Sequence, residues 1–409
     1  MAIKRIEIKD FLLFKGEFAA DFCPGVNVFI GANATGKTTL LRILYGFCQG
    51  FSNGFSDSDN IAHTVFGSSG GVDADELINK IDAFRKETKE ELEEKRKIIS
   101  EGEWEVDEYE IEELESALEN LEEDVSIWKD SIRYSFMKLF FGSSRPNKSG
   151  HVDWFRSSDS QAEVSILLQL ENNQTYSHAR IVCDNFEDLS LHPTFIPVRD
   201  ALSISKITQI NDKYRKSLDI DPIIPEIILQ ARWLVPDEIP AKAKTALEKL
   251  SNEIDGEMLV KNDGTFWIKK KNGKLISFNA EAEGYKKLGL LWQLLRNDSI
   301  SNVLFWDEPE NSLNPELFCV LADILLELAR SGVQIFIASH EYYFARYFDV
   351  REKKDIPVLF HSLTKNETGQ IEHESSPKYI KLENNHLENA AENLYEAVIS
   401  DGMGMRSNG

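Results

Sequence analysis

The chain has 409 residues, of which 42% are hydrophobic and 28% charged, so it has the composition of a globular protein and the length for two or three domains. No apolar run approaches the roughly 18 residues that span a membrane, the N-terminus lacks the apolar core of a signal peptide, and none of the four cysteines lies in a C-x-x-C pair. The net charge of −23 disfavours general binding to nucleic acid, and together these features predict a cytoplasmic protein with no membrane partner.

The first 31 residues predict two or three strands that lead into a phosphate-binding loop. The last strand, residues 26–30, is short and apolar, and the residues after position 38 have the apolar spacing of a helix. Between them, residues 31–38 match the pattern G-x-x-x-x-G-K-[ST] at every fixed position. This context predicts a nucleotide site, whose contacts we assign to Gly31, Asn33, Ala34, Thr35, Gly36, Lys37, Thr38 and Thr39.

The chemistry of phosphate binding explains the residue types in this loop. Gly31 and Gly36 let backbone N–H groups point inward, and the N-terminus of the following helix adds positive potential. Lys37 would contact the β- and γ-phosphates of ATP, and the Thr38 hydroxyl would bind Mg²⁺. The alternative is a glycine turn that carries Lys-Thr by chance. From average residue usage, such a match is about a one or two per cent event in a chain of this length.

An acidic helical hairpin is predicted next. Residues 49–74 are rich in Gly, Ser, Asn and Asp and predict a loop, whereas residues 75–140 have helical patterning with a regular apolar seam in the second arm. Residues 73–130 hold 23 acidic and 8 basic residues, a net charge of −15. The pair could pack on the globular core, or it could form a short protruding coiled coil, which its charged outer faces favour. The charge disfavours a DNA-gripping arm and suits a basic partner protein, or a DNA-mimicking or self-associating role.

The middle of the chain, residues 146–278, predicts a β lobe and a helical subdomain. Residues 200–255 are expected to be mostly helical, with prolines as breaks. Strands are expected near residues 152–155, 162–170, 176–182, 194–200, 266–268 and 275–278.

Residues 302–308 carry the second nucleotide signal, an apolar strand that ends in two carboxylates. Asp307 at the strand end can hold the water shell of Mg²⁺. Glu308 can orient and polarise the attacking water as the catalytic base. Alone, the stretch could equally be a core strand that leaves its sheet at an acidic turn. The phosphate loop upstream favours the catalytic interpretation.

His340 is the third catalytic candidate, beside Lys37 and Glu308. A helix expected at 316–329 is followed by an apolar strand at 333–338, which ends in Ser339 and His340. A lone histidine is usually a structural residue. This one ends the strand that follows the acidic strand, where a side chain could reach the γ-phosphate.

These motifs together resemble those of ABC-type ATPases of the SMC/Rad50-like and OLD-like branch, often labelled AAA family ATPases. The resemblance covers residues 1–50 and about 190–365. It implies an α/β P-loop NTPase of the ABC/SMC-head type, with an antiparallel β lobe and a helical-hairpin insertion. The expected domains are the N-terminal part of the ATPase head (1–72), the hairpin insertion (73–145), the β lobe and helical subdomain (146–278), the C-terminal part of the head (279–365) and a tail with a helix (366–409).

The resemblance also implies a composite site in a head-to-head homodimer, or in a higher homo-oligomer formed through the ATPase heads. Ser312 would begin the D-loop, His340 would be the switch histidine, and Gly284 would stand in the signature segment that covers the nucleotide of the other subunit. The usual Ser-Gly-Gly or Ser-Gly-Glu of that segment is replaced here by Ala-Glu-Gly at 282–284. The Q-loop glutamine could be Gln161 or Gln169.

The Glu-Gly variant and the Phe-Ile-Pro-Val-Arg-Asp stretch at 195–200 resemble ATPases of bacterial anti-phage modules of the PARIS, Septu and retron-associated types. That implies a separately encoded effector, a TOPRIM or HNH nuclease or a toxin, and a phage-encoded trigger. About 70 residues follow His340, too few for a fused TOPRIM domain. The alternatives are a Rad50/SMC-like DNA-repair ATPase, which DNA ends would stimulate, and the energy module of a membrane transporter. Nucleic-acid binding stays open.

The C-terminal segment has helical apolar spacing as well. It could pack on the protein's own core, or it could dock an effector. The apolar residues are Leu387, Ala390, Ala391, Leu394 and Val398.

Overall fold

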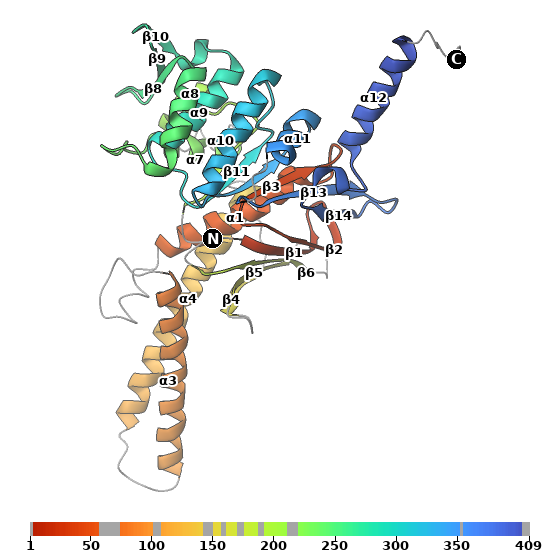
Figure 1. Cartoon of the computed structure of the whole chain (residues 1–409). Helices are drawn as coiled ribbons and strands as arrows, with labels where there is room; N and C mark the ends of the chain where they lie inside the picture. Colours follow the sequence, from red (N-terminus) through yellow and green to blue (C-terminus); the bar gives the residue numbers. More distant parts are fainter. Residues whose placement is uncertain are drawn as a thin grey trace.

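The computed structural model describes residues 3–56, 74–100, 108–141, 150–156, 161–169, 176–186, 192–210, 220–351 and 355–402. Figure 1 shows a head built from sheets and helices, with a helical hairpin and a C-terminal helix that both extend away from it. The α/β class with an antiparallel lobe and a helical-hairpin insertion is therefore confirmed. Within the described ranges, no helix is both long and apolar enough to cross a membrane.

Six strands form the central sheet of the head, and only one edge strand is antiparallel. In spatial order they are β14 (Ile371–Ser376), β13 (Val358–Lys365), β3 (Val26–Ile30), β12 (Gln334–Ala338), β11 (Val303–Asp307) and β7 (Thr194–Ile196). Every residue of β3, β11 and β12 is buried, which explains why these strands are mostly apolar. Because these three strands are parallel neighbours, their carboxyl ends meet at one edge of the sheet.

A second, antiparallel sheet shares a hydrophobic core with one face of the central sheet. Its spatial order is β2 (Phe14–Asp21), β1 (Ile3–Phe11), β6 (Tyr176–Cys183), β5 (Ala162–Gln169) and β4 (Gly150–Arg156). Helix α1 (Lys37–Ser56) follows the phosphate loop and belongs to the same core, where Tyr45 packs against Phe195 and Phe305. The loop predicted from residue 49 was wrong for residues 49–56, which are helical, and the rest of that prediction lies outside the described residues.

Helices cover the other face of the central sheet (Figure 1). They are α7 (Ile223–Ala231), α8 (Lys244–Glu253), α9 (Glu283–Arg296), α10 (Phe318–Arg330) and α11 (Tyr342–Arg351). A small antiparallel sheet lies beside them and consists of β8 (Gly256–Val260), β9 (Phe266–Lys270) and β10 (Leu275–Ser277). The strand expected at 194–200 ends at Ile196 and is followed by a 3₁₀ helix, Leu202–Gln209. The segment expected to be mostly helical thus holds two short α-helices and 3₁₀ turns in its described part.

The hairpin consists of α3 (Ala74–Ser100) and α4 (Glu108–Phe141). Its distal half protrudes, as a coiled coil would, and its basal half packs on the globular core, so each of the two interpretations from sequence fits one half. The distal arms project from the head (Figure 1) and are joined by surface ion pairs such as Lys95–Glu110, at 2.6 Å. The base is part of the head's core, where Trp128, Ile132 and Phe136 are buried. Helix α4 lies so close to α1 that a Cβ at position 46 or 50 would clash, which explains the glycines there.

This division predicts different outcomes for two deletions. Removing residues 86–120, with a short Gly-Ser bridge, should preserve one cooperative thermal transition, because the buried base remains. Removing residues 75–140 should abolish that transition, because each buried aromatic side chain lost costs about 3–5 kcal/mol. Circular-dichroism melts of both variants beside the intact chain provide the measurement. A cooperative melt of the longer deletion near the intact protein's temperature would contradict the core role of the base.

The C-terminal helix α12 (His386–Gly402) is attached to the head only near its start. Leu387 packs against the head's core, whereas every residue from Glu392 to Asp401 is exposed. Figure 1 shows the helix extending away from the body of the molecule. Packing on the protein's own core thus accounts for only the first part of the apolar stripe.

Candidate ATPase active site

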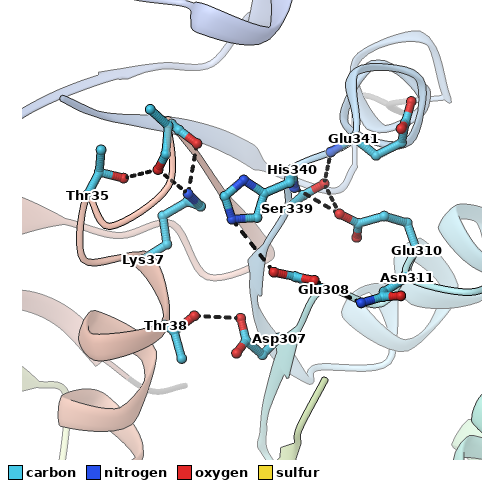
Figure 2. Close-up of polar contacts among 12 residues, drawn as sticks. Thr35, Lys37, Thr38, Asp307, Glu308, Glu310, Asn311, Ser339, His340 and Glu341 are labelled. Atoms are coloured by element: carbon cyan, nitrogen blue, oxygen red, sulfur yellow. Dashed lines mark hydrogen bonds and ion pairs between the residues drawn. The ribbon is translucent and has the colours of Figure 1, made fainter. Parts of the chain in front are cut away.

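The register of the central sheet brings the predicted catalytic segments together. Ala338 pairs with Phe29 on one side and with Asp307 on the other. The main-chain N–H of Glu308 donates to the Ala338 carbonyl at 2.9 Å, so the turn after β11 stays joined to β12. Figure 2 shows that the phosphate loop, the acidic turn and His340 face one another at this edge.

The phosphate loop has the backbone that its glycines allow. Gly31 and Gly36 have φ values of 146° and 93°, and Ala34 has a φ of 61°. A Cβ on Gly31 would lie 2.3 Å from the Leu363 carbonyl oxygen, so no side chain fits there. The Thr35 hydroxyl donates to the Ala32 carbonyl at 2.9 Å and closes the loop. The loop conformation thus requires glycine at its first position.

Lys37 lies inside this loop. Its Nζ donates to the carbonyl oxygens of Gly31 and Ala32 at 2.8 and 2.9 Å. Burial lowers the pKa of Lys37 to about 8, although the nearby carboxylates of Asp307 and Glu308 act in the opposite direction. A charge-assisted bond to a phosphate oxygen is stronger than a bond to a neutral carbonyl, so the ammonium is well suited to bind an anion.

Thr38 and Asp307 form a pair of oxygen donors next to the lysine. The Thr38 hydroxyl donates to Asp307 Oδ1 at 3.0 Å. Asp307 is buried, and this burial raises the pKa of its carboxyl to about 6. A hydroxyl and a carboxylate are hard ligands of the kind that Mg²⁺ prefers, so the pair fits this ion. Asn33 and Ala34 are exposed at the loop, and Thr39 is half-buried in the first turn of α1.

Glu308 has a constrained main chain and a side chain within reach of solvent. Its φ is 47°, an unfavourable value for a residue other than glycine, and such strain concentrates at active sites. Glu308 Oε2 accepts from the Asn311 side-chain amide at 3.1 Å, and Oε1 lies 3.7 Å from His340 Nε2. Burial, and then the charge of Lys37, lower the pKa of His340, which favours the neutral ring. The carboxylate is therefore oriented but not fully paired.

Glu310 is a site residue that the motif analysis did not assign. Its Oε1 accepts from the Ser339 hydroxyl and from the His340 main-chain N–H, both at 2.8 Å (Figure 2). It joins the acidic turn after β11 to Ser339 and His340, which follow β12. The only sequence signal for it is its place two residues after Glu308, which does not identify its distant partners.

Burial of Glu310 predicts a pH-dependent cost in stability. Burial raises the pKa of its carboxyl to about 7, so the folded state binds a proton that the unfolded state releases near its ordinary pKa of 4.5. Stability from this group is therefore lost as pH rises between these two values, by up to roughly 3 kcal/mol. Relative to wild type, Glu310→Gln should become progressively more stable from pH 5 to pH 8 in urea unfolding. A stability difference that does not change with pH would contradict a carboxyl that is protonated when folded.

Lys287, on helix α9, is a second site residue that the motif analysis did not assign. Its side chain is buried, and its Nζ donates to the Glu308 main-chain carbonyl at 2.7 Å. Burial lowers the pKa of this ammonium to about 8, although the charges of Glu310 and Glu308 act to raise it. Helix α9, which begins in the segment expected to be the signature, is thus bonded directly to the backbone of the candidate base.

Gly284 and Ser312 lie together, but no direct bond joins them to the phosphate loop among the described residues. A Cβ on Gly284 would lie 2.9 Å from the Ser312 carbonyl oxygen, so the expected signature segment packs against the expected D-loop of its own chain. Their proposed contact with a nucleotide of a second subunit stays a prediction. Gln161 precedes β5 and Gln169 ends it, but the side chain of Gln169 lies outside the described residues, so the Q-loop assignment also stays open.

Comparison with known families decides the classification. A family model described as "AAA domain, putative AbiEii toxin, Type IV TA system" matches residues 26–346, more than half of the chain. The chain belongs to this AAA family. The matched range contains the phosphate loop, the acidic turn and His340, and it ends before α12.

Individual relatives match only a short part of this AAA protein's sequence, and the solved structures have low TM-scores. The DNA replication and repair protein RecF of Lactobacillus gasseri is 53% identical over 45 residues, 11% of this chain, and the match spans only 12% of that protein's length. Among solved structures, an Smc head bound to the C-winged helix domain of ScpA has a TM-score of 0.45 at 10% identity, with coverage of 92% of this chain and 98% of that one.

Two further solved structures also have TM-scores below 0.5 and low sequence identity. The SMC head domain from Thermotoga maritima has a TM-score of 0.40 at 10% identity and covers 92% of this chain and 99% of its own. A nucleotide-free ATP-binding cassette from an ABC transporter has a TM-score of 0.36 at 13% identity and covers 94% and 95%.

Proposed function

We propose that this AAA protein binds Mg²⁺–ATP and hydrolyses it to ADP and phosphate. The observation that carries the proposal is the convergence of Lys37, the Thr38–Asp307 pair and Glu308 at one edge of a parallel sheet. Lys37 would bind the phosphates, and Thr38 with Asp307 would hold Mg²⁺, which supplies positive charge to the phosphate oxygens.

Glu308 would accept a proton from the water that attacks the γ-phosphorus. As the new P–O bond forms, the bond to the oxygen that bridges the β- and γ-phosphates breaks, and ADP leaves with that electron pair. His340, beside Glu308, would sense the γ-phosphate. Phosphate release with Mg²⁺, compared with release in excess chelator, tests this activity directly.

We further propose that two heads pair when ATP binds. Gly284 and Ser312 form one joint surface in the chain, and it would cover the nucleotide of the partner subunit. Sedimentation of the protein with and without ATP and Mg²⁺ tests this pairing. A protein that remains monomeric with bound ATP would exclude the composite site.

The biological role that we propose is regulation of a separately encoded effector in a bacterial anti-phage module. Two observations support it, namely the family description, which names a toxin of a type IV toxin–antitoxin system, and the motif resemblance to defence ATPases. The effector would be a TOPRIM or HNH nuclease or a toxin, released or activated by a phage-encoded trigger. Phage plating on cells that carry the whole gene cluster, with wild-type or Lys37→Ala protein, is the test.

DNA repair is the second candidate, because the short match to RecF concerns a protein named for replication and repair. The measurement that separates the two candidates is ATP turnover with and without linear duplex DNA. Stimulation by DNA ends of about tenfold, together with unchanged phage plating, would favour the repair role.

A further inference from the structure

The start of helix α12 is held to the head by hydrogen bonds and apolar packing. Asn385 Oδ1 accepts from the Glu388 main-chain N–H at 3.1 Å, which caps the helix, and from the Tyr379 hydroxyl at 3.2 Å. Leu387 packs against the core of the head. The start of the helix therefore has a defined position relative to the head.

The remainder of α12 carries an apolar stripe that no described part of the chain covers. Leu394, Tyr395 and Val398 are 66%, 73% and 62% exposed, and Ile399 continues the stripe. A 17-residue helix is marginally stable in water without tertiary packing. A contiguous exposed apolar surface on such a helix is typical of an interaction site.

Leu394, Tyr395 and Val398 of this stripe line one wall of a groove of about 970 Å³. The opposite wall is formed by His340 and Glu341 and by the start of α11. The α11 residues that line it are Tyr342 and the exposed Tyr343. Because His340 itself lines the groove, an occupant would contact the residue that lies beside Glu308 in the active site.

The charged residues that line this groove are all acidic. Glu341 lines one wall, and Glu388, Glu392 and Glu396 line the other, with no lysine or arginine among the lining residues. The sequence of α12 contains no lysine or arginine either. A second copy of α12 would bring like charges to this groove, so charge disfavours self-association here.

We propose that the groove between α11 and α12 docks an amphipathic helical segment of a separately encoded partner, with apolar residues flanked by lysine and arginine. Its apolar side chains would cover Leu394 and Val398, and its basic residues would pair with the glutamates. The occupied groove would change ATP turnover through the segment that carries His340. The effect on ATP turnover rests on the proposed ATPase function, whereas docking of the partner segment does not.

A labelled 18-residue peptide provides the probe, with leucines at helical positions i, i+3, i+4 and i+7 and lysines on both flanks. Its affinity is measured by fluorescence anisotropy without nucleotide. We expect Leu394→Glu and Val398→Glu each to weaken binding at least tenfold. Leu234→Glu is the control, because Leu234 is exposed and does not line the groove, and it should leave the peptide affinity unchanged. A scrambled peptide of the same composition is tested on the wild-type protein. Its affinity should be no higher than the affinity of the designed peptide for the Leu394→Glu protein.

The arms of this experiment separate docking, charge and catalysis. Equal affinity for wild type and Leu394→Glu would overturn the proposal, because attraction to acidic surface alone would then explain binding. Wild-type self-association that Leu394→Glu abolishes would also overturn it, in favour of a second copy. Saturating peptide should change wild-type ATP turnover at least twofold and leave Leu394→Glu turnover unaffected, and unchanged wild-type turnover would refute the coupling. Absence of any turnover would refute the ATPase proposal alone, since docking is measured without nucleotide.

Discussion

The Glu308→Gln variant should bind ATP with near-normal affinity and hydrolyse it at least about a hundredfold more slowly, the lower end of the range for a positioned base. Glutamine has the size of glutamate, and its carbonyl oxygen can still accept from the Asn311 amide at the position of Oε2. It cannot accept a proton from water. The change therefore removes the base and leaves Lys37, Thr38 and Asp307 in place.

Single-turnover hydrolysis and equilibrium nucleotide binding, measured on one preparation, separate the two effects. Glu316→Gln is a matched control, because Glu316 is an exposed glutamate eight positions later. The control should retain wild-type turnover. Near-normal turnover of Glu308→Gln would mean that another group acts as the base. Loss of nucleotide affinity in the same variant would mean that the carboxylate contributes to binding rather than to the chemical step.

Lys37→Ala should lose nucleotide affinity itself, by at least about a hundredfold. The buried ammonium would make two contacts to charged phosphate oxygens, and each such bond contributes about 1.5 kcal/mol or more. In the free protein the same ammonium bonds to two loop carbonyls, so melting curves should accompany the titration. Isothermal titration with a slowly hydrolysed ATP analogue measures the affinity.

Lys15→Ala, at an exposed position in β2, is the control for charge alone. It should bind the analogue as wild type does. If Lys37→Ala melts like wild type and also binds the analogue like wild type, residues 31–38 do not form the nucleotide site. If both lysine variants lose affinity equally, net charge rather than a specific contact governs binding.

The parts of the site that were predictable from sequence are those encoded in contiguous residues. Lys37 and Thr38 follow directly from the loop pattern, and Asp307 and Glu308 end an unbroken apolar strand. Parallel pairing then brings the strand ends together without further information. Glu310 was not predictable in this way, because its partners lie 29 and 30 positions away and hydrogen bonding carries no periodic signal.

Tertiary packing also overrode local composition in two elements. The glycine- and serine-rich residues 49–56 predict a loop, yet they are helical because Gly50 allows α4 to approach α1 closely. The seam in the second arm of the hairpin is continuous in sequence, yet its distal half projects and its basal half is buried. Periodicity shows that a face is apolar, but it does not show what covers that face.

The bond between Lys287 and the Glu308 main-chain carbonyl joins α9 directly to the turn that carries the proposed base. A small rotation of α9 about its axis would draw this carbonyl with it and change the direction of the Glu308 side chain, while the phosphate loop, on a separate strand, stays still. We therefore expect a displacement of α9 to affect the proposed base rather than the phosphate-binding residues.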